Sequence, residues 1–104
     1  MSSLTTPARV RNRFPESCPP DYVMDELIAD ASAWLEARVG RSISSTDNYY
    51  SLARSICTNR TVVLVILRKY GGSETTMAAK YRVLLEQFQV MVTEELNELR
   101  RVLP

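Results

Sequence analysis

The residues that interrupt helices are confined to a few places in this chain. Four of the five prolines lie within the first 20 residues, and the fifth is residue 104. The three glycines stand at position 40 and at the adjacent positions 71 and 72. Proline and glycine are the residues least compatible with a helix interior. The rest of the chain is therefore left as three long segments that are free to form helices.

The first of these segments carries a clear helical pattern over residues 22–39. Asp21 follows two prolines and is of a type that caps helix N-termini, and Gly40 is placed to end the helix in a left-handed conformation. A polar loop is expected over residues 40–48. The apolar side chains recur at steps of three and four residues, which places them on one helix face: Val23, Leu27, Ile28, Ala31, Trp34, Leu35 and Val39.

A second helix is predicted over residues 47–70. The β-branched run at residues 61–66 would by itself also fit a buried strand. The length of the segment favours a helix, because neither glycine nor proline interrupts it and the apolar stripe keeps its phase on both sides of the run. Its second half is apolar on almost every side, which predicts a central position in the fold.

A third helix is predicted from about Met77 to the C-terminus. About 27 residues at a rise of 1.5 Å would span roughly 40 Å. This is more than the core of a three-helix domain of this size requires. We therefore expect the second half of the helix to pack on something outside the monomer.

Residues 1–20 combine most of the prolines with little apolar periodicity, so they are predicted to form an extended arm. Arg9, Arg11 and Arg13 alternate and would point to one side of such an arm. The arm would be a solvated terminus, or it would dock on a neighbouring subunit or an acidic partner. The predicted fold is all-α, a small bundle of three main helices with a long C-terminal helix. The arm comprises residues 1–20, and the helical domain comprises residues 21–104.

The composition argues against an enzyme. Histidine, the commonest general base and a common metal ligand, is absent, and the few glycines form no phosphate-binding loop. Two cysteines fit neither a disulfide framework nor a zinc site. No catalytic residue, cofactor or metal is therefore predicted. The longest apolar run, residues 62–67, is too short to span a membrane, and we expect a cytosolic protein with reduced thiols.

The charged clusters are predicted to be solvated surface. Asp25, Glu26 and Asp30 on the first helix are expected to face solvent, and the acidic residues Glu94, Glu95 and Glu98 are expected to form surface ion pairs with Arg100 and Arg101. Surfaces for interaction are predicted instead from placement in the arm, at the end of the second helix and in the distal half of the third. The candidate residues are Arg9, Arg11, Arg13, Arg68, Lys69, Tyr70, Val92, Leu96, Leu99 and Leu103.

Three segments together resemble the head–tail connector, or adaptor, proteins of tailed bacteriophages and prophages. The first has an Asp-Ala-Ser centre and a terminal Gly-Arg, the second is an apolar helix with a basic-aromatic end, and the third has a Lys-Tyr pair near its start. They read DELIADASAWLEARVGRS (25–42), DNYYSLARSICTNRTVVLVILRKYGG (47–72) and MAAKYRVLLEQFQVMVTEELNEL (77–99).

This resemblance implies a structural virion assembly protein. Its subunits would form a ring between the portal protein and the tail-completion protein, and DNA would be met only as it passes through the channel. The expected location is the virion head–tail junction, reached from the host cytoplasm during assembly. The alternative is a small dimeric helical regulatory or DNA-binding protein. Residues 47–72, with four basic residues and one acidic residue, are the feature that favours it.

Overall fold

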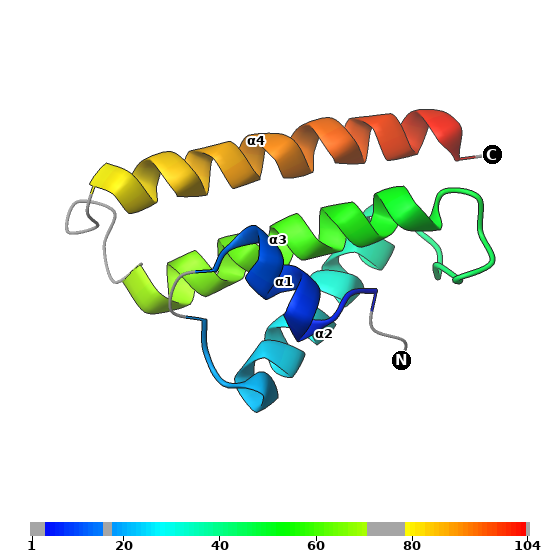
Figure 1. Cartoon of the computed structure of the whole chain (residues 1–104). Coiled ribbons are helices and arrows are strands. Elements are labelled where there is room, and N and C mark those ends of the chain that lie inside the picture. Colours follow the sequence, from blue (N-terminus) through cyan, green and yellow to red (C-terminus); the bar gives the residue numbers. More distant parts are fainter. Residues whose placement is uncertain (1–3, 16–17, 71–78, 104) are drawn as a thin grey trace.

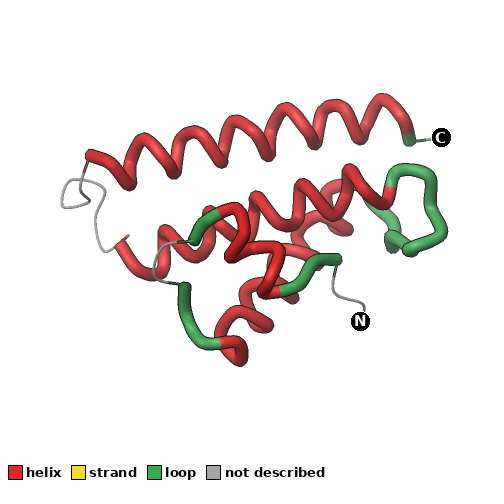
Figure 2. Tube along the Cα trace, viewed as in Figure 1, coloured by secondary structure: helices red, strands yellow, loops and turns green. Residues whose placement is uncertain are grey.

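The computed structural model describes residues 4–15, 18–70 and 79–103. These residues form four α-helices and no strand, so the fold is all-α as predicted (Figures 1 and 2). The helices are α1 (Pro7–Arg13), α2 (Asp21–Val39), α3 (Tyr50–Tyr70) and α4 (Ala79–Val102).

Helix α2 begins and ends within one residue of the prediction. Its N-cap is Pro20, whose carbonyl oxygen accepts hydrogen bonds from the backbone N–H groups of Val23 and Met24 at 3.0 and 2.9 Å. Asp21 is the first helical residue and not the cap, which corrects the sequence-based assignment. Gly40 ends the helix with φ of 73° and donates its N–H to the Glu36 carbonyl at 2.9 Å, which confirms the left-handed stop.

Helix α3 begins at Tyr50, three residues later than predicted. The residues before it form a turn, in which a carboxylate oxygen of Asp47 accepts the Ser44 backbone N–H at 2.8 Å. The run at residues 61–66 is helical, so the strand alternative is excluded. Two features used in the sequence analysis lie outside the described residues, namely the adjacent glycines at positions 71 and 72 and the predicted helix start at Met77.

The N-terminal segment departs from the prediction, because Pro7–Arg13 are helical and not extended. Thr6 is the N-cap, and its hydroxyl accepts the backbone N–H of Arg9 at 3.4 Å. Proline at the first helical position has the φ that a helix needs and lacks only an N–H that would have no partner there. Val10 and Phe14 are buried in the core, so burial of apolar surface stabilises a segment that the sequence suggested was unpacked.

Helix α3 lies at the centre of the fold and contacts each of the other three helices, as its apolar second half predicts. One buried cluster involves its C-terminal half, and the other involves its N-terminal half. The first comprises Val10, Phe14, Met24, Ile28, Val62, Val63, Val65, Ile66, Leu85 and Phe88. The second comprises Leu4, Ala31, Leu35, Ile43, Ala53, Ile56, Cys57, Val92, Leu96 and Leu99.

Helices α3 and α4 run antiparallel along their lengths, and α1 and α2 lie on the other side of α3 (Figure 1). The 24 residues of α4 are matched by the 21 residues of α3. The length of α4 is therefore used inside the monomer. This corrects the expectation that its second half exceeds the core of the chain.

Candidate functional site

The arginines of the N-terminal segment lie on and beside α1, where two of them bind the chain itself. The Arg11 guanidinium forms an ion pair with Asp21 and donates to the Pro19 carbonyl at 3.3 Å. The Arg13 guanidinium donates to the side-chain oxygen of Asn59 at 2.7 Å. Arg9 is exposed beside a shallow hollow shared with Arg13. The three residues are therefore not a row on an extended arm.

Arg13 belongs to a polar network that joins α1, α3 and α4. Its guanidinium also donates to the Ser55 hydroxyl at 3.1 Å. Ser55 and Asn59 in turn donate to the two carboxylate oxygens of Glu95, each at 2.6 Å. Glu95 therefore faces inward and is not in a surface ion pair, which corrects the sequence-based expectation. Every charge in this network has a partner.

The residues at the end of α3 flank a second shallow hollow. Arg68 and Lys69 are exposed and line it with Cys18. The Cys18 thiol donates to the Phe14 carbonyl at 3.1 Å. Burial raises the pKa of this thiol, against the opposing effect of the Arg11 and Lys69 charges. The side chain of Tyr70 lies outside the described part of the chain.

The predicted apolar surface of α4 is core. Val92, Leu96 and Leu99 are buried in the second cluster, and Leu103 packs against it. These four side chains were expected to meet a partner because α4 is long. Val92, Leu96 and Leu99 are covered mainly within the monomer and Leu103 is half-buried, so the stripe is not the continuous exposed surface that was expected.

An apolar surface does lie on another side of α4. Val83, Val90 and Met91 are exposed by 52%, 53% and 38%, and with Glu86 and Gln87 they line a hollow of about 590 Å³. Positions separated by seven and eight residues share one side of a helix. We call these five residues, together with Glu94, the outer face of α4. No other described helix covers it.

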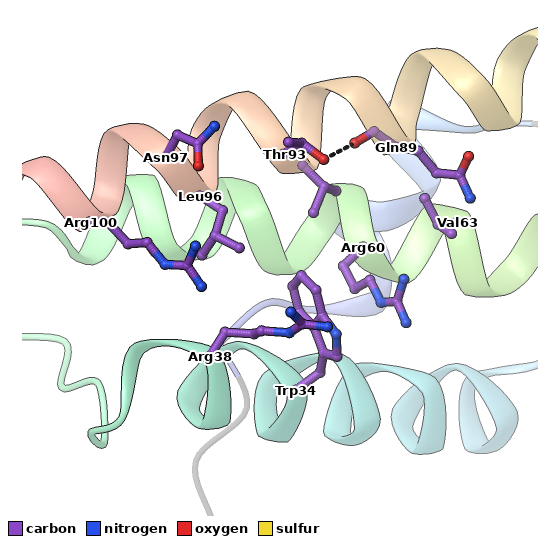
Figure 3. Close-up of a pocket in the computed structure, with 10 residues that line it drawn as sticks. Trp34, Arg38, Arg60, Val63, Gln89, Thr93, Leu96, Asn97 and Arg100 are labelled. Carbon is purple, nitrogen blue, oxygen red and sulfur yellow. Dashed lines mark hydrogen bonds between the residues drawn. The ribbon is translucent and has the colours of Figure 1, made fainter.

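Another pocket, of about 410 Å³, lies where α2, α3 and α4 meet (Figure 3). Trp34 and Arg38 come from α2, Arg60 from α3 and Arg100 from α4. The guanidinium carbons of Arg38 and Arg60 lie 5.3 and 4.7 Å from the centre of the Trp34 ring. We call this the arginine pocket. Its remaining lining is apolar or neutral: Val63, Gln89, Val92, Thr93, Leu96 and Asn97.

The positive charge of the arginine pocket is not neutralised by the described part of the chain. No acidic side chain lines the pocket, and among the described residues no carboxylate lies within ion-pair distance of Arg38, Arg60 or Arg100. The Nε of Arg60 is buried and has no hydrogen-bond partner in the described fold. Burial lowers the pKa of the Arg60 guanidinium, and the neighbouring Arg38 charge lowers it further. The arrangement can bind an anion.

Sequence reasoning missed this pocket. It placed Trp34 on the apolar face of the first predicted helix and did not single out Arg38 or Arg60. The pocket residues are separated by more than 20 positions between helices, so no local motif connects them. One signal was available in retrospect, since Trp34 and Arg38 are four residues apart on a predicted helix and would share a face.

Comparison of the chain with protein-family models, with curated proteins and with solved structures finds no match. Within the described ranges, none of the helices is long and apolar enough to cross a membrane. In the same part of the chain, no three His, Cys, Asp or Glu side chains are grouped closely enough to hold a metal ion.

Proposed function

We propose that this protein is a structural assembly subunit of the head–tail connector type, which associates with copies of itself. In this proposal the small helical bundle forms a ring at the virion head–tail junction, between the portal protein and the tail-completion protein. The ring is completed after the subunits are made in the host cytoplasm, and DNA passes through its channel. The resemblance over residues 25–42, 47–72 and 77–99 supplies the type of assembly.

The outer face of α4 is the observation that carries the proposal. Helix α4 already buries one apolar side against α3, yet Val83, Val90 and Met91 are exposed on another. Adjacent exposed apolar side chains are a feature of protein interaction sites, whereas single ones are ordinary. Glu86 and Glu94 flank Val90, so this face is both apolar and acidic. An acidic, apolar surface fits a basic, apolar one, and the same chain offers such a surface in its arginine pocket.

The distribution of basic residues favours assembly over the DNA-binding alternative. The basic residues of residues 47–72 would have to gather on one face to follow a phosphate backbone. Arg54 instead stacks on Tyr50 at 4.7 Å, beside the hollow next to α1, whereas Arg60 lies in the arginine pocket. Arg68 and Lys69 line a third hollow. The cations of this segment are thus divided among three places.

Sedimentation velocity at rising protein concentration tests the proposal. We expect the wild-type chain to form species larger than a dimer, and Val90→Lys to weaken association by about tenfold or more. The lysine would stand four residues from both Glu86 and Glu94, so it is compatible with the helix. Val102→Lys is the matched control, because Val102 is a valine of the same helix with 55% exposure. It lies about 18 Å along the helix axis from Val90.

Three outcomes of this experiment distinguish the ring proposal from a monomer and from the dimeric alternative. Association that Val90→Lys weakens and Val102→Lys leaves unchanged supports the proposal. A strictly monomeric wild-type chain overturns it. A dimer that does not grow further overturns the ring and favours the dimeric alternative.

A further inference from the structure

The arginine pocket has the composition of an oxyanion receptor. Guanidinium groups form paired hydrogen bonds with carboxylate and phosphate groups, and three of them surround this cavity. Folding has placed Arg60 close to Arg38, and among the described residues it supplies neither an acidic neighbour nor a hydrogen-bond partner for the buried Nε of Arg60. Like charges held together in a partly desolvated place are unfavourable until an anion joins them.

The lining indicates what kind of anion fits. The guanidinium groups of Arg38 and Arg60 already lie over the Trp34 ring, so the ring is not free to stack on a nucleobase. Val63, Val92 and Leu96 supply an apolar wall. A glutamate side chain has both parts that this pocket would contact, an apolar stem and a carboxylate. Inorganic phosphate has no apolar part.

The surroundings of the pocket disfavour a nucleic acid. Gln89 and Thr93 line the arginine pocket and also a second hollow beside it. This second hollow includes Glu86 and Glu94 of the outer face of α4. A DNA backbone laid over the pocket would meet these carboxylates, which repel phosphate.

We infer that the arginine pocket receives a glutamate carboxylate from the outer face of α4 of a neighbouring copy of this chain. Glu86 or Glu94 meets Arg38, Arg60 and Arg100, while Val90 packs against the apolar wall. The inference rests on the proposed self-assembly, and it identifies the arginine pocket as the surface that the outer face of α4 contacts. Donor and acceptor adjoin along α4 but are not the same surface, so the contact can repeat head to tail. Such repetition gives a ring when the rotation between copies closes and an open filament when it does not.

Charge reversal tests the inference. One variant carries Glu86→Arg and Glu94→Arg, and so reverses the donor. The other carries Arg38→Glu and Arg100→Glu, and so reverses the pocket. We expect each variant alone to associate at least about tenfold more weakly than the wild type, because like charges then face each other. An equimolar mixture should regain association, since each donor then meets a pocket of opposite charge.

The controls use exposed charges on other helices. Asp25→Arg on α2 and Arg9→Glu on α1 reverse one acidic and one basic charge, and neither residue lines the pocket or the hollows of the outer face. Both should associate like the wild type. Circular dichroism and thermal unfolding of every variant confirm that it is folded before its association is measured.

Trp34 gives a direct signal, because it is the chain's only tryptophan. Its emission should change with protein concentration in the wild type, and only on mixing for the reversed variants. Recovery in the mixture supports the inference. Association of both reversed variants at wild-type strength, or a mixture that stays dissociated, overturns it.

Other outcomes distinguish this inference from the proposed function. If Val90→Lys weakens association while the pocket-reversed variant assembles normally, the pocket assignment fails and self-assembly stands. Recovery of a two-copy species alone supports the pocket contact but overturns the ring. A wild-type chain that never associates overturns both. Duplex DNA that shifts the Trp34 emission of the monomer, with a steep dependence on salt, reassigns the pocket to nucleic acid and overturns the inference.

Discussion

Two arginine sites on this small fold differ in how their charge is balanced. Around Arg13, the side chains of Asn59 and Ser55 accept hydrogen bonds, and Glu95 supplies the opposite charge behind them. Around Arg60, the neighbours are Trp34 and a second and third arginine, and the described residues of the lining include no carboxylate. The first site is complete within the chain and fastens α1 to α3 and α4. The second is incomplete, which is the property expected of a site that binds something else.

The largest effect that this comparison predicts is at Glu95. Glu95→Ala removes the acceptor for the side-chain amide of Asn59, which is only 2% exposed, and for the Ser55 hydroxyl. A buried donor without a partner is costly, and bonds to a charged acceptor are the stronger kind. We expect the free energy of unfolding to fall by about 3 kcal/mol, measured by urea denaturation.

Glu94→Ala is the matched control for that prediction. Glu94 is the preceding residue, is exposed, and has no hydrogen bond to α3. Its removal should change the free energy of unfolding by less than about 0.5 kcal/mol. Equal losses for the two variants would show that the hydrogen bonds from Ser55 and Asn59 to Glu95 do not stabilise the fold.

At Cys57 on α3, burial is the main cause of a shifted pKa, and this gives a prediction for stability at high pH. Burial raises the pKa of its thiol to about 11, from an ordinary value of 9.0, and the Ser32 hydroxyl lies 3.3 Å from its sulfur. The folded state therefore disfavours the thiolate that the unfolded state forms more easily. The corresponding stability is present below pH 9 and is lost as pH rises toward 11, by about 2–3 kcal/mol.

The measurement for Cys57 is urea denaturation of the wild type and of Cys57→Ala between pH 8 and pH 11. The alanine variant should be less stable at pH 8 but should lose less stability as the pH rises. Parallel pH profiles would contradict the assigned cause. In the native protein, Cys18 should react with iodoacetamide well before Cys57, because Cys57 is fully buried.

The sequence predicted the long helices well, because their apolar periodicity is local information. Residues 22–39 were placed within one residue of α2, and the left-handed Gly40 was anticipated. Helix α1 was missed because its seven residues are too few for periodicity, and because Pro7 was taken as a breaker. Thr6 followed by Pro7 was the available signal, a cap residue before a proline at the first helical position.

The functional surfaces were harder to predict, because they depend on how the helices pack. The apolar stripe of Val92, Leu96 and Leu99 is indistinguishable in sequence from an interaction stripe until its partner helix is known. Glu94 and Glu95 are adjacent and chemically alike, yet one is exposed and the other binds α3. The arginine pocket needs three helices to be in place before its charges are near one another.

A smaller effect is expected at Arg13 itself. Arg13→Gln removes the guanidinium that bonds Asn59 and Ser55, but leaves the bonds from these residues to Glu95 in place. The side chain is partly solvated, so we expect a loss of about 1 kcal/mol in the free energy of unfolding. Arg9→Gln, on the same helix and exposed, should be close to neutral. A larger loss of unfolding free energy for Arg9→Gln than for Arg13→Gln would contradict the role of Arg13 in the network.

The smallest predicted effect is a gain in the free energy of unfolding, for a substitution at Arg38. Arg38→Gln removes a positive charge near Arg60 while keeping a polar side chain on an exposed position of α2. It gives up a cation–π contact with Trp34, which the Arg60 guanidinium also makes. We expect relief of the repulsion to outweigh the loss of that contact, because the described lining of the pocket includes no carboxylate. The monomer should therefore gain about 0.5 kcal/mol of unfolding free energy at low salt. The gain should shrink at high salt, where the repulsion is screened. Urea denaturation at two ionic strengths measures this, and a salt-independent loss of stability would show that the arginine pocket is as well satisfied as the Arg13 site.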